Sequence, residues 1–173
     1  MSLKEIFMDK VIEYAKEHLN FNFETGEIKW VKYPKRYNKI NKPIYAGRKH
    51  YSGYIIITLM NKTYMAHRLI WAVYNNEWPH GCLDHIDGNK SNNSINNLRM
   101  ATRNQNAYNS KVKSSSSSGY KNVQWDSETQ KWRVRVRVDG KRYHIGRFQD
   151  VNEARLAAND FMIKNHKEFA RIS

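Results

Sequence analysis

The chain has 173 residues, a formal net charge of +14 and 40% apolar residues, which excludes a disordered tail and suits one large domain or two small ones. A charge excess of this size indicates a polyanionic partner. The single cysteine, Cys82, excludes an intrachain disulfide framework and fits a reducing cytoplasm, and no stretch approaches the roughly 20 apolar residues that span a bilayer.

The first third of the chain predicts helices and hairpins. Apolar residues recur at helical spacing over residues 3–19, which predicts an amphipathic helix. Residues 21–30 predict a hairpin with its turn at Thr25-Gly26. The segment GYIIITLMNKTYMAHRLIW predicts two strands around an Asn61-Lys62 turn, followed by a short helix from about His67 to Tyr74.

An asparagine-rich stretch, CLDHIDGNKSNNSINNLRMATRNQNAYN, follows. Residues 83–86 predict a short strand that ends in an Asp-Gly loop, and INNLRMAT (95–102) predicts a returning strand. A Thr-x-x-Gln capping box predicts that a helix starts at Arg103. This order of strand, loop, strand and helix brings Asn106 back toward Asp84-His85.

The residue types in this stretch suit metal-assisted hydrolysis. Asp84 and Asn106 offer hard oxygen ligands, which favour Mg²⁺ or Mn²⁺ over zinc, and a neutral His85 beside them is able to take a proton from water. No structural zinc is expected, because His80, Cys82 and His85 lack a Cys-x-x-Cys pair and an obvious fourth ligand. A plain turn with satisfied asparagines is the alternative, since Asn, Asp and Gly favour turns.

The C-terminal third begins after Ser114–Ser118, which predicts a flexible linker and a domain boundary. Three short strands follow, with a hairpin turn at Asp139-Gly140. Asp150 and Glu153 predict a capped helix whose alanines and Phe161 pack on the sheet.

Strand WRVRVRV separates two faces of that sheet. Side chains alternate along a strand, so three valines share one face and three arginines share the other. The arginines are Arg133, Arg135 and Arg137. The valine face is expected to pack on the helix and the arginine face to be open to solvent, where a sheet can enter the DNA major groove. The alternative is a solvated basic face without a ligand.

Residues 119–169 resemble the DNA-binding domain of plant ethylene-response factors, the APETALA type, which bacteriophage endonucleases also carry as a C-terminal appendage. The resemblance rests on the Tyr-Lys-x-Val opening, Lys131-Trp132, the Gly-Lys-Arg turn and Ile145-Gly146-x-Phe148. It implies a three-stranded sheet against a helix, with the sheet in the major groove. The DNA contacts implied by position, with Arg133 added by alternation, are Lys121, Gln124, Arg133, Arg135, Arg137, Arg142 and His144.

Residues 82–109 resemble the HNH nucleases, particularly the phage HNH homing endonucleases, and the resemblance extends back to about Phe21. The shared pattern is Asp-His-x-Asp-Gly-Asn, then Asn-x-x-Asn-Asn-Leu-Arg, then Thr-x-x-Gln-Asn-x-x-Asn, with an upstream His-Arg-Leu. The resemblance implies a ββα-metal finger in which His85 is the general base and Asn97 braces the loop as the second catalytic residue. It further implies that Asp84 and Asn106 hold one divalent metal ion. Two arginines, Arg68 and Arg103, are expected to contact phosphate.

Together these patterns predict an α+β protein. The expected domains are an HNH endonuclease domain at 1–113 with N-terminal helix, hairpins and a ββα core at about 82–110, the serine linker at 114–118, and a sheet-type DNA-binding domain at 119–173. The expected activity is site-specific, homing-type hydrolysis of double-stranded DNA with one Mg²⁺ or Mn²⁺, by a monomer or weak dimer in the bacterial cytoplasm and away from membranes. A non-catalytic DNA-binding regulator is the alternative, and an RNA-directed nuclease is a third reading.

Overall fold

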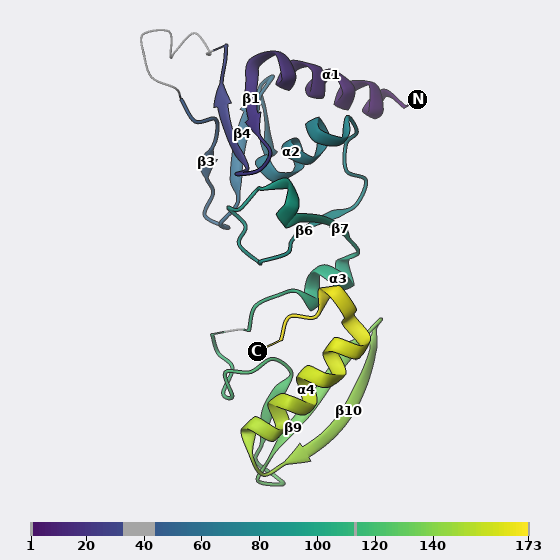
Figure 1. Ribbon diagram of the computed structural model, residues 1–173. Coiled ribbons are helices and arrows are strands. Elements are labelled where there is room, and N and C mark those ends of the chain that lie inside the picture. Colours follow the sequence, from purple (N-terminus) through teal and green to yellow (C-terminus); the bar gives the residue numbers. More distant parts are fainter. Residues whose placement is uncertain (1, 33–43, 113, 173) are drawn as a thin grey trace. The chain divides into compact units, whose positions relative to one another are not determined.

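The computed structural model describes residues 2–32, 44–112 and 114–172. The chain divides into two compact units, Met1–Met100 and Ala101–Ser173, each of which combines helices with small sheets (Figure 1). No helix within the described ranges is long and apolar enough to cross a membrane.

The first unit contains two helices, a 3-10 turn and short strands. In chain order these are α1 (Leu3–His18), β1 (Leu19–Asn22), β2 (Glu27–Trp30), β3 (Arg48–Lys49), β4 (Ile55–Leu59), β5 (Lys62–Met65), α2 (Ala66–Asn75), β6 (Cys82–His85), η2 (Ile95–Asn97) and β7 (Leu98–Ala101). The predicted helices and hairpins of this region are therefore present, with boundaries within about two residues.

Helix α1 begins at a capping box. The Ser2 hydroxyl accepts from the Glu5 backbone N–H at 3.3 Å, and the Glu5 carboxylate accepts from the Ser2 N–H at 2.6 Å. These bonds satisfy two donors that a helix start leaves open. The inner face of α1 buries Val11 and Ala15 completely.

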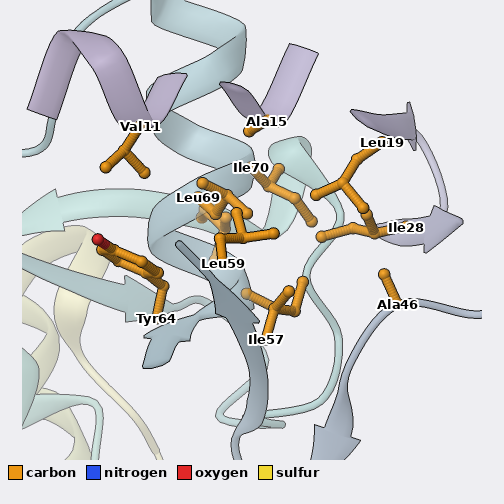
Figure 2. Packing of buried hydrophobic residues seen from close by; sticks show 12 residues of the cluster. Val11, Ala15, Leu19, Ile28, Ala46, Ile57, Leu59, Tyr64, Leu69 and Ile70 are labelled. Carbon is orange, nitrogen blue, oxygen red and sulfur yellow. The ribbon is translucent and has the colours of Figure 1, made fainter. Parts of the chain in front are cut away.

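The core of the first unit lies between these helices and the three-stranded sheet of order β3-β4-β5 (Figure 2). Leu69 and Ile70 of α2 are fully buried and meet Ile57 and Leu59 of β4 in this cluster. Complete burial of a side chain of this size contributes about 1.5–3 kcal/mol. The core therefore holds α2 against the β3-β4-β5 sheet.

The second unit contains α3 (Arg103–Tyr108), β8 (Val123–Asp126), β9 (Lys131–Val138), β10 (Lys141–Phe148), α4 (Val151–His166) and η3 (Lys167–Phe169). Its sheet is antiparallel with the order β10-β9-β8, and α4 lies across it (Figure 1). The predicted α+β class, with a three-stranded antiparallel sheet packed on one helix, is confirmed.

The inner face of this sheet is the valine face. Val134 and Val136 of β9 are 0% and 1% exposed and pack with Ala154, Ala158 and Met162 of α4. The alternation prediction is thus confirmed for the buried side. Met162 joins the alanines that the sequence indicated.

Helix α3 packs within the second unit. The Tyr108 ring stacks on His166 with 3.7 Å between centroids, and the Asp139 backbone N–H donates to the Tyr108 hydroxyl at 2.7 Å. The Lys121 ammonium donates to the carbonyl oxygens of Tyr108 and Ser110. Since the sequence assigned α3 to the nuclease domain, the compact units differ from the predicted boundary at 113, and the functional division of the chain stays a prediction.

Candidate active site

Strand β6 carries the two central residues of the site. Asp84 and His85 stand at its C-terminal end and are each 4% exposed. Burying a carboxylate and an imidazole costs free energy unless both have polar partners. The partners therefore define what this pair is able to do.

Asp84 is held by an arginine from the neighbouring strand. Arg99 of β7 contacts the Asp84 Oδ2 atom through Nε and Nη2, each at 2.9 Å. The two side chains are 16% and 5% exposed, so this is a largely desolvated ion pair. Removing one member of such a pair leaves an uncompensated charge, which makes the contact a strong constraint on the Asp84 carboxylate.

The His85 ring lies in an aromatic pocket. Its centroid is 4.9 Å from that of His67 and 5.9 Å from that of Tyr54, and its Nε2 atom is 3.1 Å from the Asn93 Oδ1 atom. Burial lowers the pKa of His85 below its ordinary value, against the opposing effect of the Asn93 contact. His85 is therefore neutral near pH 7, the form that a general base needs.

His67 is packed beside this ring. It is 4% exposed, and burial, followed by the charge of the His85 imidazolium, lowers its pKa to about 3. The neutral His67 ring, whose centroid lies 5.2 Å from that of the tilted Tyr54 ring, packs beside His85 as part of its apolar surroundings. His67 is therefore assigned a packing role.

The loop after His85 is held together by side-chain amides. The Asn97 Oδ1 atom accepts from the Asp87 backbone N–H at 3.0 Å, and its Nδ2 donates to Asp87 Oδ1 at 3.0 Å and to the Asn92 carbonyl at 2.8 Å. The turn is closed by the Gly88 N–H, which donates to the His85 carbonyl at 2.8 Å. Gly88 has a φ of +67°, which favours glycine. Asn97 thus connects both sides of the loop.

The carboxylate of Asp87 accepts three hydrogen bonds within this loop. Burial alone would raise its pKa, but hydrogen bonds from the Asn89 backbone and from the Asn92 and Asn97 amides together lower it. Asp87 is therefore charged at neutral pH and stabilises the loop as an acceptor.

Asn106 lies in α3, whose start agrees with the predicted capping box. The Thr102 hydroxyl accepts from the Gln105 N–H at 3.2 Å, and the Gln105 side chain accepts from the Thr102 N–H at 2.8 Å. Asn106 is exposed and belongs to the second compact unit. Its position relative to Asp84 stays a prediction.

The donor set fits a hard divalent cation. A carboxylate has about four lone-pair sites, so the Arg99 contact at Oδ2 is compatible with metal coordination by Asp84. An amide oxygen such as that of Asn106 is the second ligand type that Mg²⁺ accepts.

The predicted phosphate contacts differ in their surroundings. Arg68 is half-buried and donates to the carbonyl oxygens of Pro79 at 2.7 Å and Gly81 at 2.9 Å, which fixes the chain before β6. Arg103 is exposed at the start of α3. Burial lowers the pKa of Lys121 to about 8, and its ammonium binds backbone carbonyls. The phosphate and DNA roles of these residues stay predictions.

The outer face of the second-unit sheet is basic. Arg135 and Arg137 of β9 are exposed, and their cross-strand partners on β10 are His144 and Arg142, which are also exposed. Gln124 of β8 is exposed as well and pairs with β9. This outer face collects cations on one side of the sheet, as the alternation predicted.

Arg133 departs from that expectation. Its side chain is 23% exposed and lies 3.5 Å from the Asp126 carboxylate, which also accepts from Arg147 at 3.2 Å. The hydrogen bond from Arg147 lowers the pKa of Asp126, and the charge of Arg133 adds to this effect against the opposing effect of burial. The prediction that all three arginines are open to solvent is therefore wrong for Arg133, because a buried acid on the same face binds it.

Three further residues belong to these sites. Asn93 and Arg99 contact His85 and Asp84 directly, and Arg147 joins the outer face because a β-bulge between His144 and Gly146 shifts the register. A bulge reverses the alternation locally, so a strict period of two misses Arg147. Asn93 and Arg99 were not predicted either, because their contacts with His85 and Asp84 form only when the chain after β6 folds back.

Three comparisons relate the chain to known proteins. A family model described as HNH endonuclease matches residues 64–108, the segment that contains α2, β6, β7 and α3. A solved structure on DNA binding and cleavage by the HNH homing endonuclease I-HmuI is similar, at 32% identity and a TM-score of 0.39, over 53% of this chain and about half (51%) of that one.

A curated relative, Protein 3.8 of Escherichia phage T7, is 35% identical over 107 residues. The match includes 61% of this chain and 88% of that protein. Because the alignment spans most of the relative and the family model coincides with the Asp84-His85 segment, the chain belongs to the HNH endonuclease family.

Proposed function

We propose that the protein is a DNA endonuclease that hydrolyses phosphodiester bonds by a single-metal mechanism, as a site-directed, homing-type nuclease. The observation that supports this most is the buried Asp84-His85 pair at the end of β6, in which each side chain has its own polar partner. A non-catalytic DNA-binding protein has no use for a neutral, desolvated histidine beside an oriented carboxylate.

In this proposal His85 accepts the proton of the attacking water. Its neutral state near pH 7 leaves one ring nitrogen as an acceptor. Asp84 and Asn106 would hold the divalent cation, and Asn97 keeps the loop in shape through its three hydrogen bonds. A bound Mg²⁺ or Mn²⁺ would supply Lewis-acid stabilisation of the charge on the scissile phosphate and the leaving oxygen.

The second unit supplies recognition of double-stranded DNA in this proposal. The exposed side chains of Arg135, Arg137, Arg142 and His144 stand on one face of the sheet, where like charges repel unless an anion is near. Arginine on such a face is able to pair with guanine in the major groove or with phosphate. This supports the proposal of an APETALA-type sheet reader at residues 119–173, with the serine run before it as a tether.

The test is cleavage of supercoiled plasmid with Mg²⁺, with EDTA and the His85→Ala variant as controls. We expect product from the wild type alone, and we expect it to be nicked because one metal site per monomer cuts one strand at a time. Both proteins are expected to bind DNA equally. Equal binding with no cleavage by either protein, across several metals and DNA substrates, would instead support a DNA-binding regulator. Faster cleavage of RNA than of DNA would identify an RNA-directed nuclease.

A further inference from the structure

We propose that Asn93 is a positioning residue that selects the tautomer of His85, so that Nε2 carries the proton and Nδ1 is the atom that accepts a proton from water. This inference rests on the proposed role of His85 as the general base. It assigns a function to Asn93, a residue of the shared asparagine pattern for which the resemblance implied no role.

The contact itself supports a choice of tautomer. Asn93 is 3% exposed, and its Oδ1 atom lies 3.1 Å from His85 Nε2. An amide oxygen only accepts hydrogen bonds, so the nitrogen facing it has to be the protonated one. In a neutral imidazole the other nitrogen, Nδ1, then keeps the lone pair that a base requires.

The aromatic pocket restricts the alternative. Presenting Nδ1 to Asn93 would need a different side-chain rotamer of His85, and therefore space beside the His67 and Tyr54 rings, whose centroids lie 4.9 Å and 5.9 Å from that of His85. The two neighbouring rings therefore restrict the plane of the His85 ring, while the Asn93 contact determines which nitrogen carries the proton. A fixed ring plane and a fixed tautomer are both needed to orient the lone pair of Nδ1 toward one water position.

The backbone of Asn93 is held by the β1–β2 hairpin, which precedes the matched family segment. Gly26, in the turn of this hairpin, has a φ of +74°, and a Cβ atom there would lie 2.3 Å from the Asn93 carbonyl carbon and 2.4 Å from the Ser94 nitrogen. The adjoining Ile95 N–H donates to the Phe23 carbonyl at 2.8 Å. Such a close approach between two backbones is open only to glycine. The hairpin thus acts on His85 through Asn93.

The first experiment compares Asn93→Leu, which has a similarly branched side chain without an acceptor, with Asn93→Asp, which keeps the oxygen. Long-range ¹H–¹⁵N NMR of the full-length protein above pH 7, with His85→Ala used to assign the signals, reports which nitrogen is protonated. We expect the Nε2–H tautomer in the wild type and in Asn93→Asp, and a mixture in Asn93→Leu.

Kinetics form the second readout. We expect Asn93→Leu to lower kcat by roughly ten- to a hundredfold with KM for DNA unchanged, and Asn93→Asp to cleave faster than Asn93→Leu. A wild-type Nδ1–H tautomer, or an Asn93→Leu protein with unchanged tautomer and kcat, would overturn the proposal. Cleavage that survives His85→Ala would refute the proposed function instead, and the NMR result would stand independently of it.

A substitution in the β1–β2 hairpin tests the positioning of His85 without changing Asn93 itself. Gly26→Ala and Gly140→Ala both put a side chain at a positive φ, +74° and +82°, but nothing lies within 4 Å of the Cβ position at Gly140. We expect Gly26→Ala, after its folding is checked by circular dichroism, to reproduce the loss of kcat and the mixed tautomer, and Gly140→Ala to show neither. Equal kcat values and equal tautomer populations in the two variants would show that the hairpin does not position His85.

Discussion

The asparagine-rich loop of the first unit and the outer sheet face of the second unit are built on opposite principles. Asp84, His85 and Asn93 are almost completely buried, and each has a fixed polar partner. The outer face leaves Arg135 and Arg137 exposed on a regular strand. A site that orients one ring depends on many individual contacts, whereas a face that meets a polyanion depends on charge repeated at the period of the strand. Point substitutions are therefore expected to unfold or misalign the first and to weaken the second gradually.

The largest effect on stability is expected from Arg99→Met. The substitution leaves the Asp84 carboxylate, 5% exposed, without its ion-pair partner, and breaking a buried pair costs about 3–5 kcal/mol. Urea unfolding of the full chain measures the loss in the first unit. Arg103→Met, at an exposed position, is the matched control and is expected to change stability by less than about 0.5 kcal/mol. Equal losses would mean that the Asp84–Arg99 pair does not anchor the site.

The second effect is a dependence on pH that belongs to the buried pocket. The pKa of His67 is about 3 in the folded chain, well below the ordinary value of 6.5, so only the unfolded chain binds a proton between these values. Stability that is fully present above pH 6.5 is therefore lost as pH falls toward 3, by about 1.4 kcal/mol per pH unit. Urea titrations of wild type and His67→Gln between pH 7 and pH 5 measure it. Parallel curves for the two proteins would contradict a neutral, buried His67.

Asn97→Ala is expected to cost about 1–3 kcal/mol, because it leaves the Asp87 N–H and the Asn92 carbonyl without their partners. Asn96→Ala, at the exposed neighbouring position, removes the same amide at little cost. Thermal unfolding compares the two. If Asn96→Ala is the more destabilising variant, the loop is not braced as described.

The smallest stability effect, with a measurable binding effect, is expected on the outer face. Arg135→Ala should leave the unfolding temperature unchanged and lower the slope of log Kd against log salt concentration by about 1, as loss of one phosphate contact does. Arg133→Ala should behave in the reverse manner, since that side chain binds Asp126 and is only 23% exposed. An unchanged salt slope for Arg135→Ala would remove that residue from the interface.

Local rules predicted much of this structure. The start of α3 follows from the Thr102 and Gln105 capping box, and the buried Val134 and Val136 follow from strand alternation. Both patterns act over two to four residues, so the sequence displays them directly.

Contacts between distant segments were not visible in the same way. Asn93 meets His85 only because the loop folds back, and Gly26 meets Asn93 across more than sixty positions of the chain. Arg133 was misjudged because nothing in the alternation reveals that Asp126 would turn to the same face. The placement of such partners is set by tertiary packing, which overrides the local pattern.

The packing of Tyr108 on His166 has a consequence for anyone who builds chimeric nucleases from this chain. If the second unit were replaced from the serine run onward, α3 would stay in the chain but lose its partners. These are the His166 ring, the Asp139 N–H and the Lys121 ammonium, which contact Tyr108 at the end of the helix. A transplantable cassette would instead begin near Thr102, whose capping box starts the helix. Such a cassette carries Asn106 with it, so an exchanged recognition module would arrive with its own candidate metal ligand.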